Sequence, residues 1–150
     1  MQKAHYSILI NAPRERVWQK LFDDTSYRIW TEPFSPGSHF KGSWEKGSKI
    51  LFLGPGEDGK LGGMVSRIAD NKPNEFMSIE HLGIVNGGVE DTTSEAALKW
   101  VPAFENYTLK GRDGTTELLI DIDIEDSYVE MFDEMWPEAL QKLKEISEAK

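Results

Sequence analysis

His81 and Glu105 are the titratable side chains whose positions could support acid–base chemistry inside a fold. His81 shares strand parity with Met77 and Ile79, which predicts that its imidazole faces the interior. Glu105 shares parity with Tyr107 in a second strand-like stretch. If both side chains face inward, they can meet and form an acid–base pair that titrates near neutral pH.

Each of these orientations has an alternative. Phe76 and Leu82 share the parity of Glu80, so the opposite face of that strand could be the buried one. An interior His81 could serve structure alone or orient a ligand through a hydrogen bond. A carboxylate is costly to bury unless it is paired, so Glu105 could instead lie in water at a strand end. The pattern therefore leaves open whether the pair performs catalysis.

Other motifs lack residues that their chemistry requires. Residues 54–60 have the spacing of a phosphate-binding loop, but Leu61 stands where a Ser or Thr would bind magnesium, so a hairpin loop is predicted there. His5, His39 and His81 fall in separate elements without metal-binding spacing. The chain has no cysteine to act as a nucleophile or a metal ligand. We therefore predict no metal and no cofactor.

Length and charge limit the classes of partner. Residues 1–150 have the length of a single domain with its own core. Lys and Arg number 17 against 26 Asp and Glu, and the net charge of −9 repels nucleic acid and anionic lipid surfaces. The longest apolar runs fall far short of the roughly 20 residues of a membrane span, and the N-terminus lacks an apolar export signal. We predict a cytoplasmic protein that binds neither nucleic acid nor a membrane.

The elements that would position these residues begin with a strand and two short helices. Alternation over residues 6–10 predicts the strand, and Pro13 suits the first turn of a following helix. Apolar side chains recur at helical spacing over residues 17–22, and polar residues 23–26 end that helix. A second short helix is predicted over residues 27–30.

Turn signals then alternate with short apolar runs, which is typical of antiparallel strands joined by hairpins. Asp113-Gly114 is a strong hairpin signal before the most clearly alternating run. The connection over residues 86–98 is long enough to act as a mobile flap over a pocket mouth. The predicted strands cover residues 40–44, 49–53, 62–69, 76–84, 104–110 and 115–124.

The C-terminal segment predicts a long amphipathic helix. Ser127 followed by Glu130 suggests a capping box at its start. Pro137 lies inside the pattern and predicts a kink one turn earlier, at a cost on the order of 3 kcal/mol. The apolar stripe consists of Val129, Phe132, Trp136, Ala139, Leu140, Leu143 and Ile146.

This order of elements resembles the helix-grip arrangement of the SRPBCC superfamily, the START-like and Bet v 1-like proteins. Four segments resemble the branch named for homologues of the activator of heat-shock-protein ATPase. The resemblance covers nearly the whole chain and implies an α+β fold, in which a curved antiparallel sheet of about six to seven strands wraps around a long C-terminal helix, with two short helices after strand 1. The four segments are Ile8-x-Ile10-x-Ala12-Pro13-x-x-x-Val17-Trp18, Tyr27-x-x-Trp30, Phe40-x-Gly42-x-Trp44-x-x-Gly47 and Trp136-Pro137.

The resemblance also implies a cavity between the sheet and the last helix, used across the superfamily for lipids, sterols, polyketides and other apolar ligands. A sheet curved around one helix leaves more interior than that helix fills. We therefore predict that the chain binds a small hydrophobic or aromatic molecule, as a carrier or sensor and not as an enzyme. Each aromatic side chain could instead be core packing. The residues predicted to line the cavity are Trp30, Phe34, Phe40, Trp44, Phe52, His81, Glu105, Tyr107, Phe132 and Trp136.

Two other functions stay open. An enzyme of the cyclase or hydratase kind would use His81 and Glu105 as an interior acid–base pair. A stress-response protein that acts on a chaperone through its surface would fit the name of the branch. A homodimer is compatible with either function.

Overall fold

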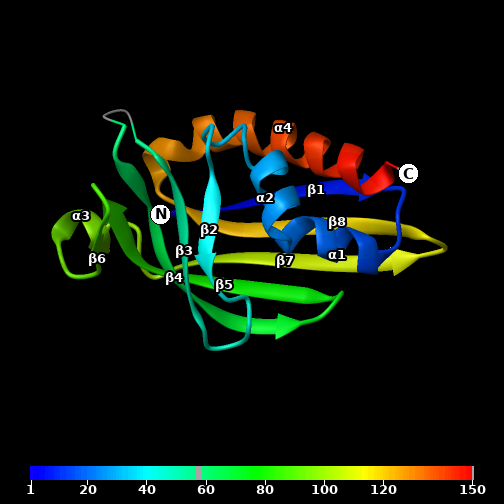
Figure 1. Cartoon of the computed structure of the whole chain (residues 1–150), viewed down its shortest axis with the longest axis horizontal. Helices are drawn as coiled ribbons and strands as arrows, with labels where there is room; N and C mark the ends of the chain where they lie inside the picture. Colours follow the sequence, from blue (N-terminus) through cyan, green and yellow to red (C-terminus); the bar gives the residue numbers. More distant parts are fainter. Residues whose placement is uncertain (57–58, 150) are drawn as a thin grey trace.

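The computed structural model describes residues 1–56 and 59–149, in which one antiparallel sheet curves towards a long helix (Figure 1). The sheet has eight strands in the order β1-β8-β7-β5-β4-β3-β2, and β6 pairs with β5. The strands are β1 (Gln2–Ile10), β2 (His39–Gly42), β3 (Lys49–Pro55), β4 (Leu61–Lys72), β5 (Phe76–Asn86), β6 (Val89–Asp91), β7 (Ala103–Arg112) and β8 (Thr115–Ile124). The helices are α1 (Arg14–Phe22), α2 (Asp24–Trp30), α3 (Glu95–Leu98), the 3-10 turn η1 (Asp126–Tyr128) and α4 (Val129–Glu148).

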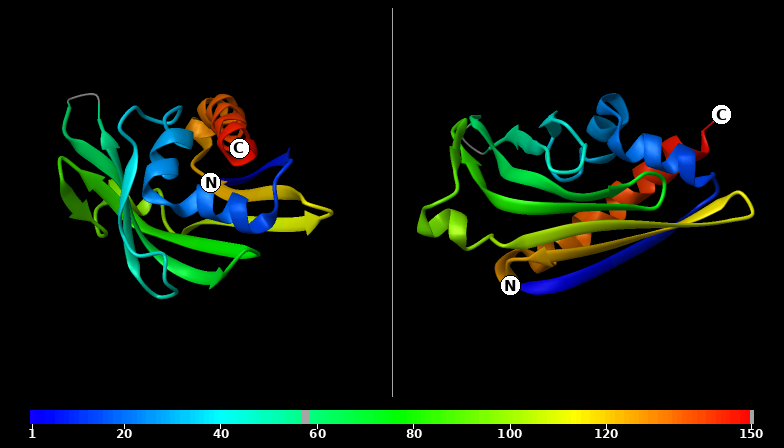
Figure 2. Two further views of the ribbon diagram at one scale, coloured as in Figure 1. Left: turned by 45° about the vertical axis from the view of Figure 1, so that its right-hand side comes forward. Right: turned by 90° about the horizontal axis from the view of Figure 1, so that it is seen from below.

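The predicted α+β helix-grip architecture is confirmed. Figure 2 shows α4 nearly end-on above the sheet, with α1 and α2 beside it. The face of α4 that turns to the sheet buries Trp136, Leu140 and Leu143, and the helix contacts β1, α1 and α2. Opposite this face, Leu118 and Ile120 of β8 are fully buried, as the alternation of that strand predicts.

The connection after β5, predicted as a mobile flap, contains regular secondary structure. It contains the short strand β6, paired with the end of β5, and the four-residue helix α3. Asp91 accepts hydrogen bonds from the backbone amides of Thr93 and Ser94, and the Ser94 hydroxyl accepts from the amide of Ala97. These side chains satisfy the backbone donors that precede a helix, and they therefore allow a segment with little apolar content to be ordered.

The start of α4 also differs from the prediction. Ser127 belongs to η1, and its amide donates to the side chain of Glu125, so Ser127 and Glu130 do not form a capping box. Helix α4 continues through Pro137, and the kink expected one turn earlier stays a prediction. Because Pro137 is exposed, solvent can hydrate the carbonyl of Asp133 that lacks an amide partner, and the helix can continue without a break.

The β3–β4 hairpin is formed, with Pro55 opposite Leu61. Glu57 and Asp58, in the loop predicted between these strands, lie outside the described residues. No described helix combines the length and the apolar character needed to cross a membrane.

Candidate functional site

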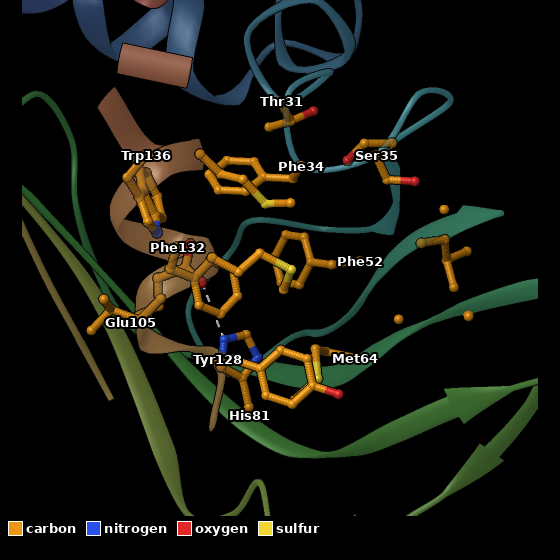
Figure 3. A pocket seen from close by; sticks show the side chains of 18 of the residues that line it. Thr31, Phe34, Ser35, Phe52, Met64, His81, Glu105, Tyr128, Phe132 and Trp136 are labelled. Carbon is orange, nitrogen blue, oxygen red and sulfur yellow. Dashed lines mark hydrogen bonds and ion pairs between the residues drawn. The ribbon is translucent and has the colours of Figure 1, made fainter. Parts of the chain in front are cut away.

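A pocket of about 560 Å³ lies between the concave face of the sheet, α2 with the loop that follows it, and the first turns of α4. Figure 3 shows aromatic side chains from these elements around a polar pair formed by His81 and Glu105. Eight of the ten residues predicted from the sequence line it: Trp30, Phe34, Phe52, His81, Glu105, Tyr107, Phe132 and Trp136.

Phe40 and Trp44 do not line this pocket. Their rings contact each other, with centroids 5.1 Å apart, and both pack against Tyr27. Trp44 also contacts Phe22 of α1, at 4.6 Å between centroids. These two side chains fill the space between α1, α2 and the β2–β3 hairpin, and Tyr27 forms part of the pocket wall in their place.

The predicted inward orientation of His81 and Glu105 is confirmed, and the two side chains are in contact. The antiparallel register of β5 with β7 sets Ile79 opposite Glu105 and Met77 opposite Tyr107, so these residues share the concave face with His81. His81 Nε2 lies 3.2 Å from Glu105 Oε1 (Figure 3). The side chains are 9% and 18% exposed, so the pair is largely removed from solvent yet borders the pocket.

The pair belongs to a hydrogen-bonded chain of four side chains. Ser66 Oγ lies 2.7 Å from His81 Nδ1, and the hydroxyl of Tyr107 donates to Glu105 Oε2. One assignment satisfies every member with a neutral imidazole: Ser66 donates to Nδ1, and Nε2–H donates to the ionised carboxylate. His81 is therefore held by a partner on each side, and Glu105 receives a hydrogen bond on each of its oxygens.

Ser66 is the member of this chain that the sequence argument missed. It is fully buried on β4, opposite His81, and the β4–β5 register shifts between Val65 and Ser66. Because Leu82 has no opposite residue at this irregularity, the bulge changes which side chains face inward beyond it. The sequence did contain a signal for this role of Ser66. It lies between Met64 and Ile68, which share its strand parity and face inward, and a polar side chain buried among apolar ones needs a hydrogen-bond partner.

Two tyrosines of the pocket wall are strongly perturbed. Burial raises the pKa of Tyr107 well above its ordinary value, and the negative charge of Glu105 raises it further. Burial raises the pKa of Tyr27 in the same direction, again with a contribution from Glu105. Both phenols therefore stay protonated where an exposed tyrosine ionises.

These shifts predict an alkaline titration in which the folded protein retains phenolic protons. Above about pH 10 the unfolded chain releases protons that Tyr27 and Tyr107 keep in the folded state, so the free energy of unfolding falls as the pH rises. Phenolate absorbance at about pH 11 should be lower in the native protein than in denaturant. The Tyr107→Phe variant should show a smaller difference in phenolate absorbance between native and denatured protein. Equal absorbance of the native and denatured wild-type protein would contradict the burial of Tyr27 and Tyr107 in the pocket wall.

One edge of the pocket is formed by Trp100 and Tyr128. Their rings are in contact with centroids 4.7 Å apart and planes inclined by 55°, and both residues line the pocket. Trp100 follows α3, two residues after the connection predicted to be a flap, and Tyr128 precedes α4, so the chain just beyond that connection touches the segment that starts the long helix. Movement of this connection stays a prediction.

Comparison with solved structures finds this architecture in several proteins of low sequence identity. The Aha1 dimer from Colwellia psychrerythraea is 18% identical, with coverage of 99% of this chain and 97% of that one and a TM-score of 0.72. Protein CV1439 from Chromobacterium violaceum is 19% identical over all of both chains, with a TM-score of 0.71. The chain therefore shares the fold of these proteins.

A third helix-grip neighbour is DynU16, a protein of the dynemicin biosynthetic locus. It is 16% identical, the alignment covers 97% of this chain and 46% of DynU16, and the TM-score is 0.68. No protein-family model matches the sequence. No curated protein matches it either. At these identities the comparisons support the fold and leave the function to be argued from the site.

Proposed function

We propose that this protein binds a small apolar or aromatic molecule in the pocket between the sheet and α4, as a carrier or sensor. The observation that carries the proposal is a pocket of about 560 Å³ bordered largely by aromatic and aliphatic side chains, with one polar pair at its wall. This volume and composition are typical of sites that enclose a small organic ligand.

The hydrogen-bonded chain supports a binding role. Ser66 and Tyr107 hold His81 and Glu105 in fixed orientations, and fixed polar groups in an apolar wall give a ligand its orientation. Both nitrogens of His81 and both oxygens of Glu105 already have partners inside the protein. A proton transfer to a ligand would require one of these hydrogen bonds to be exchanged.

An acid–base enzyme of the cyclase or hydratase kind is the second candidate. The specific observation in its favour is the contact of 3.2 Å between His81 and Glu105 at the pocket wall. DynU16, whose locus is biosynthetic, shares the fold. A compound that the wild-type protein converts, and that a His81→Ala variant binds without converting it, would favour the enzyme.

Membership in the branch of ATPase-activator homologues, a chaperone partner and a homodimer stay proposals. They are supported by the similarity of the fold to that of the Aha1 dimer. Size-exclusion chromatography with light scattering tests the dimer directly.

Binding can be tested with N-phenyl-1-naphthylamine, a neutral aromatic probe whose fluorescence rises in apolar surroundings. Ala103 is buried and lines the pocket, so Ala103→Phe should place a ring in the space that the probe needs. We expect the wild-type protein to bind the probe saturably and Ala103→Phe to bind it at least about tenfold more weakly.

Ala96→Phe is the matched control, because Ala96 is exposed on α3 and does not line the pocket. It should bind the probe as the wild-type protein does. Equal affinity of the probe for Ala103→Phe and the wild-type protein, with both variants folded by circular dichroism, would place the binding elsewhere. Native mass spectrometry of protein from its own host then identifies the natural ligand as an added mass.

A further inference from the structure

With a neutral His81, the charges around the pocket are unbalanced. Among the described residues that line it, none is Lys or Arg, and the acidic residues are Glu105 and Asp123. Asp123 is already compensated, because Lys3 Nζ lies 2.9 Å from one oxygen and the amide of Phe104 donates to the other at 2.9 Å. Glu105 has no such cationic partner in the neutral-imidazole arrangement.

The partners of Glu105 determine what a ligand can offer it. His81 and Tyr107 each donate one hydrogen bond, and a carboxylate has about four acceptor positions. The N–H of His81 and the O–H of Tyr107 are thereby already engaged as donors. Lone pairs of the carboxylate and of the Tyr107 hydroxyl remain free to accept a hydrogen bond from a ligand. The indole N–H of Trp136 has no partner, but it is enclosed by protein atoms and closed to a ligand. A polar group of the ligand that reaches the Glu105 carboxylate must therefore donate.

Aromatic rings surround the same carboxylate. Tyr27 and Tyr107 lie close enough for the charge of Glu105 to raise the pKa of each, in addition to the effect of burial. The ring of Trp136 lies 6.3 Å from that of Tyr107, and Phe52 packs edge-on against His81 at 6.1 Å. The faces of Trp, Tyr and Phe rings attract organic cations.

We propose that the ligand of this pocket is an apolar molecule that carries an ammonium group, with the ammonium directed at Glu105. The inference rests on the proposed binding function and names the chemical class of the ligand. An ammonium supplies donated hydrogen bonds and, where His81 is neutral, the positive charge that balances a largely buried carboxylate. The net charge of −9 also attracts cations to the protein.

The test compares three probes that share one ring system: 1-naphthylmethylammonium, the neutral 1-naphthylmethanol and the anionic 1-naphthoate. Calorimetric titration of the wild-type protein should show the ammonium binding at least about tenfold more tightly than the alcohol, because a charge-assisted hydrogen bond to a buried group is worth a factor of this size or more. The carboxylate probe should bind most weakly.

Glu105→Gln removes the charge and keeps the shape, with an amide that can still pair with His81 and Tyr107. It should reduce the preference for the ammonium by about tenfold and change the affinity for the alcohol by less than about threefold. Glu117→Gln is the matched control, because it changes the net charge equally at an exposed position of β8. It should leave the preference intact.

The outcomes separate this inference from the function on which it rests. If the alcohol binds the wild-type protein as tightly as the ammonium, or if Glu105→Gln keeps the full preference, the ammonium proposal is overturned and the pocket function stands. The same holds if N-phenyl-1-naphthylamine binds in the pocket while the ammonium probe does not. If neither compound binds, both proposals fall.

Discussion

Replacing Trp30 with alanine is expected to lower the free energy of unfolding by about 3–5 kcal/mol. Trp30 is 1% exposed at the end of α2, and its indole N–H donates to the carbonyl of Leu21 at 3.0 Å. Its ring contacts those of Tyr27 and Trp136, at 5.5 and 6.1 Å between centroids. The substitution thus removes a large buried volume and leaves a buried carbonyl without its partner.

Urea denaturation followed by circular dichroism measures the effect, with Trp18→Ala as the matched control. Trp18 is only partly buried on α1, where its ring meets that of Phe22 at 4.8 Å, so its loss should cost distinctly less. Trp30→Phe should fall between the wild-type protein and Trp30→Ala, because it restores the ring and not the hydrogen bond. Similar losses for Trp30→Ala and Trp18→Ala would contradict the placement of α2 against α4.

The position of Trp30 also links stability to binding. It is a wall of the pocket and at the same time the contact between α2 and α4 through Trp136. A ligand that packs against this indole therefore contacts the interface of α2 with α4. Because such a ligand binds the folded state only, its binding should raise the melting temperature.

The fold was predictable because periodicity reports burial directly. The alternation of β8 and the stripe of α4 identify the two faces that enclose the interior. The inward face of β8 is buried as expected, and Trp136, Ala139, Leu140 and Leu143 of the stripe are buried, whereas its other three members are partly buried. Parity favoured the concave face for His81 and Glu105 and left the opposite orientations open; the register of β5 with β7 decides between them and brings the two side chains together.

The remaining features depend on pairing across the chain, which a local pattern does not contain. Phe40 and Trp44 have the composition of pocket residues, but the path of the β2–β3 hairpin turns them towards Tyr27 instead. Ser66 meets His81 because a bulge shifts the register between β4 and β5. Short elements such as β6 are formed by pairing with a neighbouring strand, so their own three residues carry little signal.

Gly63→Ala is the second substitution with a large expected effect, a loss of roughly 3 kcal/mol or more. Gly63 of β4 has a φ of +145°, which a residue with a side chain rarely adopts. A Cβ at this position would lie 1.8 Å from the carbonyl oxygen of Phe52 in β3. Backbone cannot rotate away as a side chain can, so the β3–β4 pairing would have to separate.

Gly88→Ala isolates the contribution of this clash. Gly88 has a φ of +81°, but a Cβ there would have nothing within 4 Å, so only the backbone strain of about 1–2 kcal/mol should appear. Because Phe52 is a wall of the pocket, Gly63→Ala should also weaken binding of N-phenyl-1-naphthylamine, whereas Gly88→Ala should not. Equal losses of stability in the two variants would show that β4 does not approach Phe52 as closely as described, and the pocket wall would then need a different shape.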